Sequence, residues 1–369
     1  MSYYLYKLLY DPETTLSFFR LFGYLSVRSI FAFATAFFVS IIFGKKIIKY
    51  LLKKGLREHS REFYKEIAPV TKKGTPTMGG LLIIISILVP VFLWCNLGNR
   101  FIQLLLGALF WFGTIGFIDD YLKIKSARGD GGMSRTYKLL LQITFGIVLG
   151  ILVLNKSTSP FPEEIINHIY IPFFKGIVTL SWLYFFFIIF VVTSISNAVN
   201  FADGLDGLAV VPASVVAAVY GVFAYILGRV DYSSYLLFEH IPNSGEITVF
   251  CAAVAGAGLG FLWYNTYPAQ IFMGDVGSQA LGGVLAVTAI LVKQEFLFLI
   301  AGGIFLAEAF SVLIQDRIGI AKIGKRIFFR APLHHTFQYR GTAEPTVVVR
   351  FWIISILLAL ASLATLKIR

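Results

Sequence analysis

The chain has 369 residues, of which 57% are hydrophobic, 16% aromatic and only 14% charged. A soluble domain carries roughly 25% charged residues, so polar groups this scarce cannot cover a surface that faces water. The composition excludes an ordinary soluble enzyme and predicts a protein whose main solvent is the lipid bilayer. The net charge of +12 does not indicate nucleic-acid binding, because the basic residues lie between apolar runs rather than in one patch.

The N-terminal segment and the cysteines add little chemistry. Residues 1–20 mix charged and aromatic side chains without the short apolar core of a cleavable signal peptide. They are more typical of an interfacial segment that leads into a first membrane span. Cys95 and Cys251 both lie in apolar segments and predict neither a disulfide framework nor a metal site.

Ten apolar runs are long enough for a tilted helix to cross a hydrocarbon core of about 30 Å. Their apolarity is continuous and lacks the two-residue alternation of barrel strands, so they predict helices. They cover residues 21–43, 79–97, 101–118, 139–154, 177–193, 207–228, 247–263, 276–292, 296–314 and 348–366. We therefore expect an all-α, polytopic membrane protein in which residues 1–369 form a single transmembrane domain.

The orientation follows from the basic residues. The loops 44–78, 119–138 and 315–350 hold most of the 32 lysines and arginines. Loops rich in these residues face the cytoplasm, so ten spans place both termini outside. The polar stretches that follow spans three, five, seven and nine then all face the cytoplasm, and an inner loop adds a fifth, "VTKKGTPTMGG". The four are "GFIDDYLKIK", "NAVNFADGLDGLA", "NTYPAQIFMGDVGS" and "RAPLHHTFQYRG".

The first of these stretches contains adjacent carboxylates, Asp119 and Asp120. They end an apolar run near a helix C-terminus, where the helix dipole disfavours negative charge. A solvated helix end, partly neutralised by Lys123 and Lys125, is the plainer interpretation. The sharper one is a site for a hard cation such as Mg²⁺, which keeps several waters and shares its shell with substrate phosphates.

The second stretch spaces Asn197, Asn200, Asp203 and Asp206 by three residues, which stacks them along one side of a helix if the stretch is helical. Asp206 is also a good candidate for the N-cap of the following span. One cap, however, needs only one side chain. The regular row therefore favours a polar site over capping alone.

The third stretch places Asp275 between glycines directly before the eighth span. An N-cap role is again an alternative. A glycine-flanked helix N-terminus is also a ready anion site, because its backbone N–H groups point at phosphate oxygens. A carboxylate there repels phosphate unless a cation bridges the two, so the stretch predicts a metal-bound phosphate.

The fourth stretch places His334 and His335 in a loop with Arg326, Arg330 and Arg340. Adjacent histidines in a basic loop fit contact with a diphosphate or proton handling. A zinc site is not predicted, because no companion cysteine or histidine has ligand spacing.

Two further features remain open at this point. Lys72 and Lys73 of "KKGTPT" suit a phosphate or a nucleotide, with a membrane-surface role as the alternative; the order of residues is not that of a Walker A loop. Glu308 lies deep in the ninth predicted span, where ionisable groups are functional suspects. Its partner cannot be named from the sequence, and a structural hydrogen bond is the alternative to catalysis.

Five motifs carry a resemblance that covers nearly the whole chain: "PVTKKGTPTMGG", "DDYLK", "NAVNFADGLDGLA", "FMGDVGSQALGG" and "APLHHTF". Together and in this order they resemble the phospho-N-acetylmuramoyl-pentapeptide transferases. The resemblance implies transfer of phospho-MurNAc-pentapeptide from UDP-MurNAc-pentapeptide to undecaprenyl phosphate, with Mg²⁺, giving lipid I and UMP for peptidoglycan synthesis. It also implies a homodimer in the bacterial plasma membrane, with ten helices, external termini and a cytoplasmic site.

The resemblance assigns roles to individual positions. It makes Asp275 the metal ligand, with Asp119, Asp120 and His334 as further catalytic residues. Contacts with the substrates fall to other polar or aromatic positions of the same site: Lys72, Thr77, Lys123, Lys138, Asn200, Asp203, Asp206, Asn265, Phe272 and His335. Many members of the family have a third consecutive histidine where this chain has Thr336, to which we assign no role.

Alternatives remain for the mechanism and for the function. We expect the lipid phosphate, oriented by Asp119, to attack the β-phosphorus directly; the alternative is a phospho-enzyme on an aspartate. The nearest rival function is transfer of N-acetylglucosamine 1-phosphate from UDP-GlcNAc to a polyprenyl phosphate. A transporter needs polar residues in the middle of several spans, and only Glu308 qualifies. A lipid-binding scaffold leaves the carboxylates unexplained.

Overall fold

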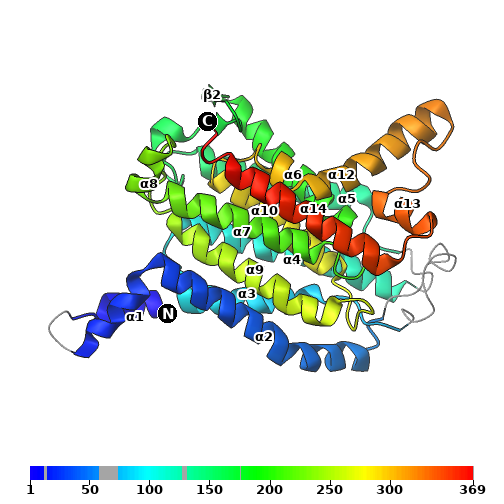
Figure 1. Cartoon of the computed structure of the whole chain (residues 1–369), viewed down its shortest axis with the longest axis horizontal. Helices are drawn as coiled ribbons and strands as arrows, with labels where there is room; N and C mark the ends of the chain where they lie inside the picture. The colour runs from blue at the N-terminus through cyan, green and yellow to red at the C-terminus, as the bar shows by residue number, and fades with distance from the viewer. Residues whose placement is uncertain (12–14, 58–73, 127–130, 175, 369) are drawn as a thin grey trace.

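The computed structural model describes residues 1–11, 15–57, 74–126, 131–174 and 176–368, and most of them are helical. The long helices lie side by side in one bundle (Figure 1). They are α2 (Leu25–Lys53), α4 (Arg100–Lys125), α5 (Arg135–Leu154), α6 (Leu183–Ala202), α7 (Val210–Leu227), α9 (Gly245–Asn265), α10 (Gly274–Leu291) and α14 (Glu344–Ala364). All eight are long and apolar enough to cross a membrane. The predicted all-α, polytopic fold is confirmed.

The structure also contains shorter elements. They are α1 (Ser2–Leu9), η1 (Thr15–Gly23), α3 (Gly80–Trp94), η4 (Glu163–Ile165), α8 (Val230–Tyr235), α11 (Phe298–Ala301), α12 (Gly303–Leu313), η5 (Ile314–Ile323) and α13 (Leu333–Tyr339). Of these, α3 packs against α2, α9 and α10 within the bundle. The second predicted span, 79–97, corresponds to the shorter apolar helix α3.

The ninth predicted span, 296–314, is not one continuous helix. It is broken at Gly302 into α11 and α12, and it continues as the π-helical segment η5. Gly302 and Gly303 are adjacent, and glycine loses more backbone entropy in a helix than any other residue. The continuous apolarity of the run hid this break.

The fifth predicted span, 177–193, begins too early. Strand β2 (Ile177–Thr179) pairs antiparallel with β1 (His168–Tyr170), and His168 lies opposite Thr179. Helix α6 begins only at Leu183. The β-branched residues of β2 are apolar enough to resemble the start of a span, yet they favour a strand.

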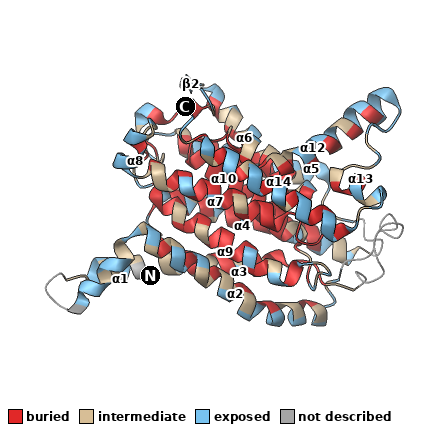
Figure 2. Ribbon diagram, viewed as in Figure 1, coloured by how far each residue is buried: buried red, intermediate tan, exposed pale blue. Residues whose placement is uncertain are grey.

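Helix α10 is the central helix of the bundle. Every residue from Val276 to Leu291 is buried, and Figure 2 shows the buried residues concentrated on the inner helices. It packs against α3, α4, α6 and α7. A Cβ atom on Gly116 of α4 would lie 2.1 Å from the carbonyl oxygen of Asp275. Small residues therefore bring the neighbouring backbones into direct contact with α10.

The two chain termini lie at one end of the bundle, and α13 lies at the other (Figure 1). This arrangement agrees with an even number of membrane crossings. Beside α13, the end of α12 and the segment η5 project away from the bundle. The described residues of the polar stretches singled out in the sequence gather at the α13 end, which we call the loop end.

Candidate active site

Three carboxylates meet where α4 ends and α10 begins. Asp119 and Asp120 lie in the last two turns of α4, and Asp275 lies in the first turn of α10. One oxygen from each carboxylate lies within 4.8 Å of the other two. Asp119 and Asp120 are only 2% and 3% exposed, which excludes the solvated helix end. Three carboxylates this close, of which Asp119 and Asp120 are buried, form a candidate site for a hard cation.

Two lysines neutralise part of this negative charge. The Lys123 Nζ atom lies 2.7 Å from Asp119 Oδ2 and 3.1 Å from Asp275 Oδ2. Lys138, from α5, forms an ion pair with Asp275, and its Nζ atom lies 3.4 Å from Asp119 Oδ2. Three carboxylates and two ammonium groups leave a formal excess of one negative charge. In a site shielded from water, that excess favours a bound cation.

Backbone N–H groups fix two of the carboxylates. The N–H of Val276 donates to Asp120 Oδ2 at 3.2 Å, and the N–H of Met133 donates to Asp119 Oδ1 at 2.7 Å. Gly274, the residue directly before Asp275, has a φ of +69° and lies against Asp120 of α4. A Cβ atom there would lie 2.4 Å from Asp120 Oδ2, so this turn requires glycine both for its conformation and for space.

The two aspartates that could cap helices do not occupy the cap positions. Met273 is the N-cap residue of α10 and Ala209 that of α7, and neither makes a side-chain cap bond. Asp275 instead accepts a hydrogen bond from Asn200 Nδ2 at 3.2 Å. Asp206 accepts one from a backbone N–H in the loop before α10. The capping interpretation is wrong for both residues.

The polar residues that are spaced by three at the end of α6 contact several different elements. Asn200 Nδ2 also donates to Ser278 Oγ at 2.7 Å, which joins α6 to α10 beside Asp275. Asp203 is the C-cap residue of α6. The backbone N–H of Asp206 donates to Glu344 Oε1 at 3.1 Å, at the start of α14.

Asn265, at the end of α9, joins two loops of the same region. Its Oδ1 atom accepts the N–H of Gly207 at 2.9 Å, and its Nδ2 atom donates to the carbonyl oxygen of Ile271 at 2.8 Å. Both ends of the side-chain amide are therefore bonded to backbone groups. In this structure Asn265 holds the α6–α7 turn against the loop that leads into α10.

The segment before α3 lies along the loop that carries Phe272. The N–H of Phe272 donates to the carbonyl oxygen of Pro76 at 2.9 Å, and the N–H of Gly79 donates to the carbonyl oxygen of Phe272 at 2.8 Å. This pairing brings the buried Thr77 next to Gly274, the residue before Asp275. Lys72 lies outside the described residues.

The histidines lie on α13, and His334 packs against the α6–α7 turn. His334 and Glu308 are both fully buried; Glu308 Oε1 accepts the N–H of His334 at 3.2 Å, and Oε2 lies 3.2 Å from His334 Nδ1. A Cβ atom on Gly204 would lie 2.2 Å from His334 Nε2, so that nitrogen faces the end of α6. His335 Nδ1 lies 3.0 Å from Gln338 Oε1. Glu308 thus has the partner that the sequence left unnamed.

The end of α6 connects the two halves of the site. Asn200 contacts Asp275 on one side, and Gly204, one turn further, lies against His334. Of the candidate residues that the structure describes, all lie at the loop end of the bundle. The carboxylates and lysines form the most compact group among them.

Several polar residues near the site escaped the sequence analysis. Ser278 follows Asp275 by three residues, a helical spacing that could have identified it. Glu344 is an acidic residue in a basic loop, which is a weaker signal. Gln142 and Gln279 lie inside predicted spans and are fully buried, so Glu308 is not alone as a polar residue within a span.

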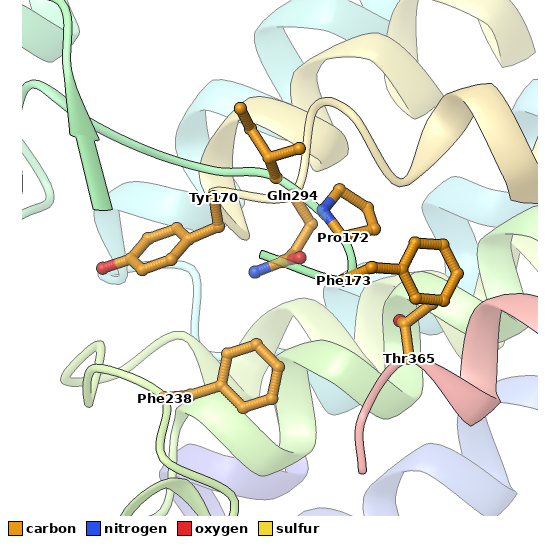
Figure 3. A pocket seen from close by; sticks show the side chains of 7 residues that line it. Tyr170, Pro172, Phe173, Phe238, Gln294 and Thr365 are labelled. Carbon is orange, nitrogen blue, oxygen red and sulfur yellow. The ribbon is translucent and has the colours of Figure 1, made fainter. Parts of the chain in front are cut away.

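A small hollow, drawn in Figure 3, lies beside strand β1 and the end of α14, near the C-terminus in Figure 1. It is lined by Tyr170, Ile171, Pro172, Phe173, Phe238, Gln294 and Thr365. None of these is a candidate site residue. The hollow is therefore separate from the carboxylate cluster.

Comparisons with known proteins agree with the motifs. Residues 102–293 match the model of glycosyl transferase family 4, and residues 72–84 match the phospho-N-acetylmuramoyl-pentapeptide-transferase signature 1. A phospho-N-acetylmuramoyl-pentapeptide-transferase of Desulfosudis oleivorans is 46% identical over 366 residues, which is 99% of this chain and 100% of that protein. The enzymes of that name from Desulfatibacillum aliphaticivorans and Citrifermentans bemidjiense are 45% and 44% identical over the same shares. The chain belongs to the phospho-N-acetylmuramoyl-pentapeptide-transferase family.

Proposed function

We propose that the chain transfers phospho-MurNAc-pentapeptide from UDP-MurNAc-pentapeptide to undecaprenyl phosphate, yielding lipid I and UMP for peptidoglycan synthesis. The observation that carries the proposal is the cluster of Asp119, Asp120 and Asp275 at one end of a membrane bundle. The full-length relatives described above are named for this activity. A site at a bundle end is accessible both to a water-soluble nucleotide and to a lipid whose phosphate lies at the membrane surface.

We place the protein in the bacterial plasma membrane with the loop end facing the cytoplasm. Most of the basic residues lie in the loops that we assign to this side, as expected for cytoplasmic loops. The proposed homodimer rests on the family resemblance.

The donor set fits Mg²⁺. This ion prefers oxygen ligands and is usually held by one or two carboxylates together with waters and substrate phosphates. We assign Asp275 as its main protein ligand, with Asp119 and Asp120 within reach on the facing helix. When bound, Mg²⁺ would neutralise charge on the diphosphate and on the departing phosphate.

The cationic and imidazole groups complete the binding of the nucleotide. Lys123 and Lys138 lie between the carboxylates, where they reduce the repulsion between Asp275 and an incoming phosphate. Glu308 Oε2 lies beside Nδ1 of His334, and Nε2 of the same ring faces the α6–α7 turn. We propose that His334 and His335 contact the diphosphate from this side.

We propose direct attack of the lipid phosphate on the β-phosphorus. A bond forms between an oxygen of the lipid phosphate and that phosphorus, and the bond to the bridging oxygen breaks, so UMP leaves with the electron pair. A phosphate monoester has its second pKa near ~6, so the nucleophile is largely dianionic at neutral pH and needs little base assistance. Asp119 is bonded to a backbone N–H and to Lys123, which makes it a poor nucleophile and a suitable residue to orient the lipid phosphate.

The experiment is UMP release by the purified protein in lipid nanodiscs with Mg²⁺ and undecaprenyl phosphate. Parallel reactions contain UDP-MurNAc-pentapeptide or UDP-GlcNAc. We expect UMP only with the muramyl substrate. Release of UMP only from UDP-GlcNAc supports transfer of N-acetylglucosamine 1-phosphate instead. Release from neither substrate refutes the proposed transferase activity. An acyl-phosphate trapped by rapid quench would overturn direct attack.

A further inference from the structure

Three side-chain amides form a bonded layer beneath the carboxylate cluster. Gln142 of α5 donates from Nε2 to Asn197 Oδ1 at 3.3 Å, and Asn197 of α6 returns a bond from Nδ2 to Gln142 Oε1 at 2.7 Å. Gln142 Nε2 also donates to Gln279 Oε1 of α10 at 2.9 Å. Gln142 and Gln279 are fully buried. The layer therefore joins three helices inside the bundle.

Each amide lies one helical turn from a residue of the carboxylate site. Gln142 follows Lys138 by four residues on α5, and Gln279 follows Asp275 by four residues on α10. On α6, which runs the other way, Asn197 precedes Asn200 by three residues. Residues three or four apart share a helix face. The same three helix faces thus carry the amide layer and, one turn closer to the loop end, the contacts of Asp275.

The pattern of hydrogen bonds holds α5, α6 and α10 at fixed positions relative to one another. The Gln142 and Asn197 amides each donate to and accept from the other, so a shift of α5 against α6 breaks both bonds together. A polar group without a partner is unfavourable in a buried site, which opposes such a shift. Gln279 extends this restraint to α10, the helix that begins with Asp275.

We propose that Gln142, Asn197 and Gln279 are positioning residues that hold Lys138, Asn200 and Asp275 in the arrangement that binds the divalent cation. The proposal rests on the proposed function for the role of Asp275 as a metal ligand. It assigns the layer no contact with either substrate. Residues that hydrogen-bond metal ligands directly change metal affinity by about 10–100-fold when they are replaced, and we expect the lower end of this range for a layer one helical turn away.

The test measures binding of Mn²⁺ alone to the protein. Electron paramagnetic resonance reports the concentration of free Mn²⁺, and Mg²⁺ serves as competitor. Gln142→Met keeps the side-chain length and removes the bonds. We expect it to weaken Mn²⁺ binding by about tenfold and to raise the Mg²⁺ concentration for half-maximal UMP release by a similar factor. The KM for UDP-MurNAc-pentapeptide at saturating Mg²⁺ should stay near that of the unmodified protein.

Two controls separate positioning from a general loss of structure. Gln103→Met removes an exposed amide at the other end of α4 and should leave Mn²⁺ binding unchanged. The exchange Gln142→Asn with Asn197→Gln keeps one long and one short amide facing each other and should restore most of the affinity. Gln279→Met, which leaves the Gln142–Asn197 bonds in place, serves as a second variant if Gln142→Met does not give folded protein.

The outcomes are distinct. Folded Gln142→Met or Gln279→Met with unchanged Mn²⁺ affinity overturns the positioning role. So does a loss of affinity that the exchanged pair fails to restore although that protein is folded. If the unmodified protein binds no Mn²⁺ and releases no UMP, it is the proposed function that fails.

Discussion

At the scale of single residues, Asp275 contacts charged and polar side chains from three helices. It pairs with Lys123 and Lys138, and it accepts a hydrogen bond from Asn200. Its side chain remains 17% exposed, whereas Asp119 and Asp120 are almost closed off. It is therefore the carboxylate of the cluster that solvent and a hydrated cation reach most easily.

Asp275→Ala should abolish UMP release, with a loss of at least about 100-fold, and should remove most of the Mn²⁺ binding. The reason is that two lysines remain in a site with one fewer carboxylate, so a cation is repelled. UMP release and Mn²⁺ binding measure the two effects. Asp231→Ala breaks an exposed ion pair between Asp231 of α8 and Arg229, which precedes that helix; it is the matched control and should behave as the unmodified protein. Near-normal activity of Asp275→Ala contradicts the metal assignment.

Glu308 provides a second prediction at this scale. Glu308→Gln keeps an acceptor for the N–H of His334 but loses the charge beside Nδ1, whereas Glu308→Ala loses both. We expect a lower kcat in both variants, by about tenfold or more, with the alanine variant more affected and less stable. Steady-state UMP release and thermal melting of the same samples check this order. Equal and normal kcat values in both variants would remove Glu308 from the site.

Single residues also mark the limit of sequence reading. Asp119, Asp120 and Asp275 could be named as candidates because carboxylates are unusual at the ends of apolar runs, although a solvated helix end and a helix cap were alternatives. Gln142 and Gln279 were not, because an isolated amide in an apolar run gives no sign of its partners until three helices are packed together. The backbone N–H of Met133, which bonds Asp119, leaves no signal in the side-chain pattern at all.

At the scale of elements, α2 and α9 are joined near the terminal end by a buried ion pair. Arg28 Nη1 lies 2.9 Å from Glu246 Oε2, and Nη2 lies 2.5 Å from Oε1. The same Glu246 oxygen that bonds Nη1 also accepts the N–H of Asn96, between α3 and α4. One carboxylate thus joins α9 both to α2 and to the connection between α3 and α4.

Arg28→Met should destabilise the protein by roughly 3–5 kcal/mol, because it leaves the charge of Glu246 buried without its partner. Adding Glu246→Gln removes that charge, so the double variant should be more stable than Arg28→Met alone. Thermal unfolding in detergent, followed by tryptophan fluorescence, gives the comparison. A melting temperature of Arg28→Met equal to that of the unmodified protein would show that the pair contributes little.

The elements themselves were largely readable from apolarity. Every predicted span is helical over most of its length, because a membrane helix must satisfy all its backbone hydrogen bonds internally. The errors occur where the backbone preferences of particular residues outweigh the effect of apolarity. Adjacent glycines break the ninth span at Gly302, and β-branched residues divert the start of the fifth into β2. Apolarity alone does not distinguish these cases from continuous helix.

At the scale of the whole molecule, the parity of the spans predicted that distant motifs share one end, and the described residues of those motifs do so. The absolute orientation across the membrane stays a prediction. It can be tested because Cys95 and Cys251 are buried, at 0% and 2% exposure, and should give little background with a membrane-impermeant thiol reagent.

Asp231→Cys, at the terminal end, should be labelled in intact spheroplasts. Lys325→Cys, in the exposed loop after η5, should be labelled only after the membrane is opened. The reason is the excess of basic residues in the loops that we assign to the cytoplasm. A shift in the electrophoretic mobility of the protein on a gel shows whether each variant has been labelled. Labelling of Lys325→Cys from outside would reverse the proposed topology.

The enclosure of α10 has a mechanical consequence. Bilayers differ in thickness, and membrane helices adjust to the difference by tilting. A helix that is covered by protein from Val276 to Leu291 does not meet the acyl chains, so this force acts first on its neighbours. The aspartate on the first turn of α10 is thereby insulated from the physical state of the membrane, even though one of its two proposed substrates is dissolved there.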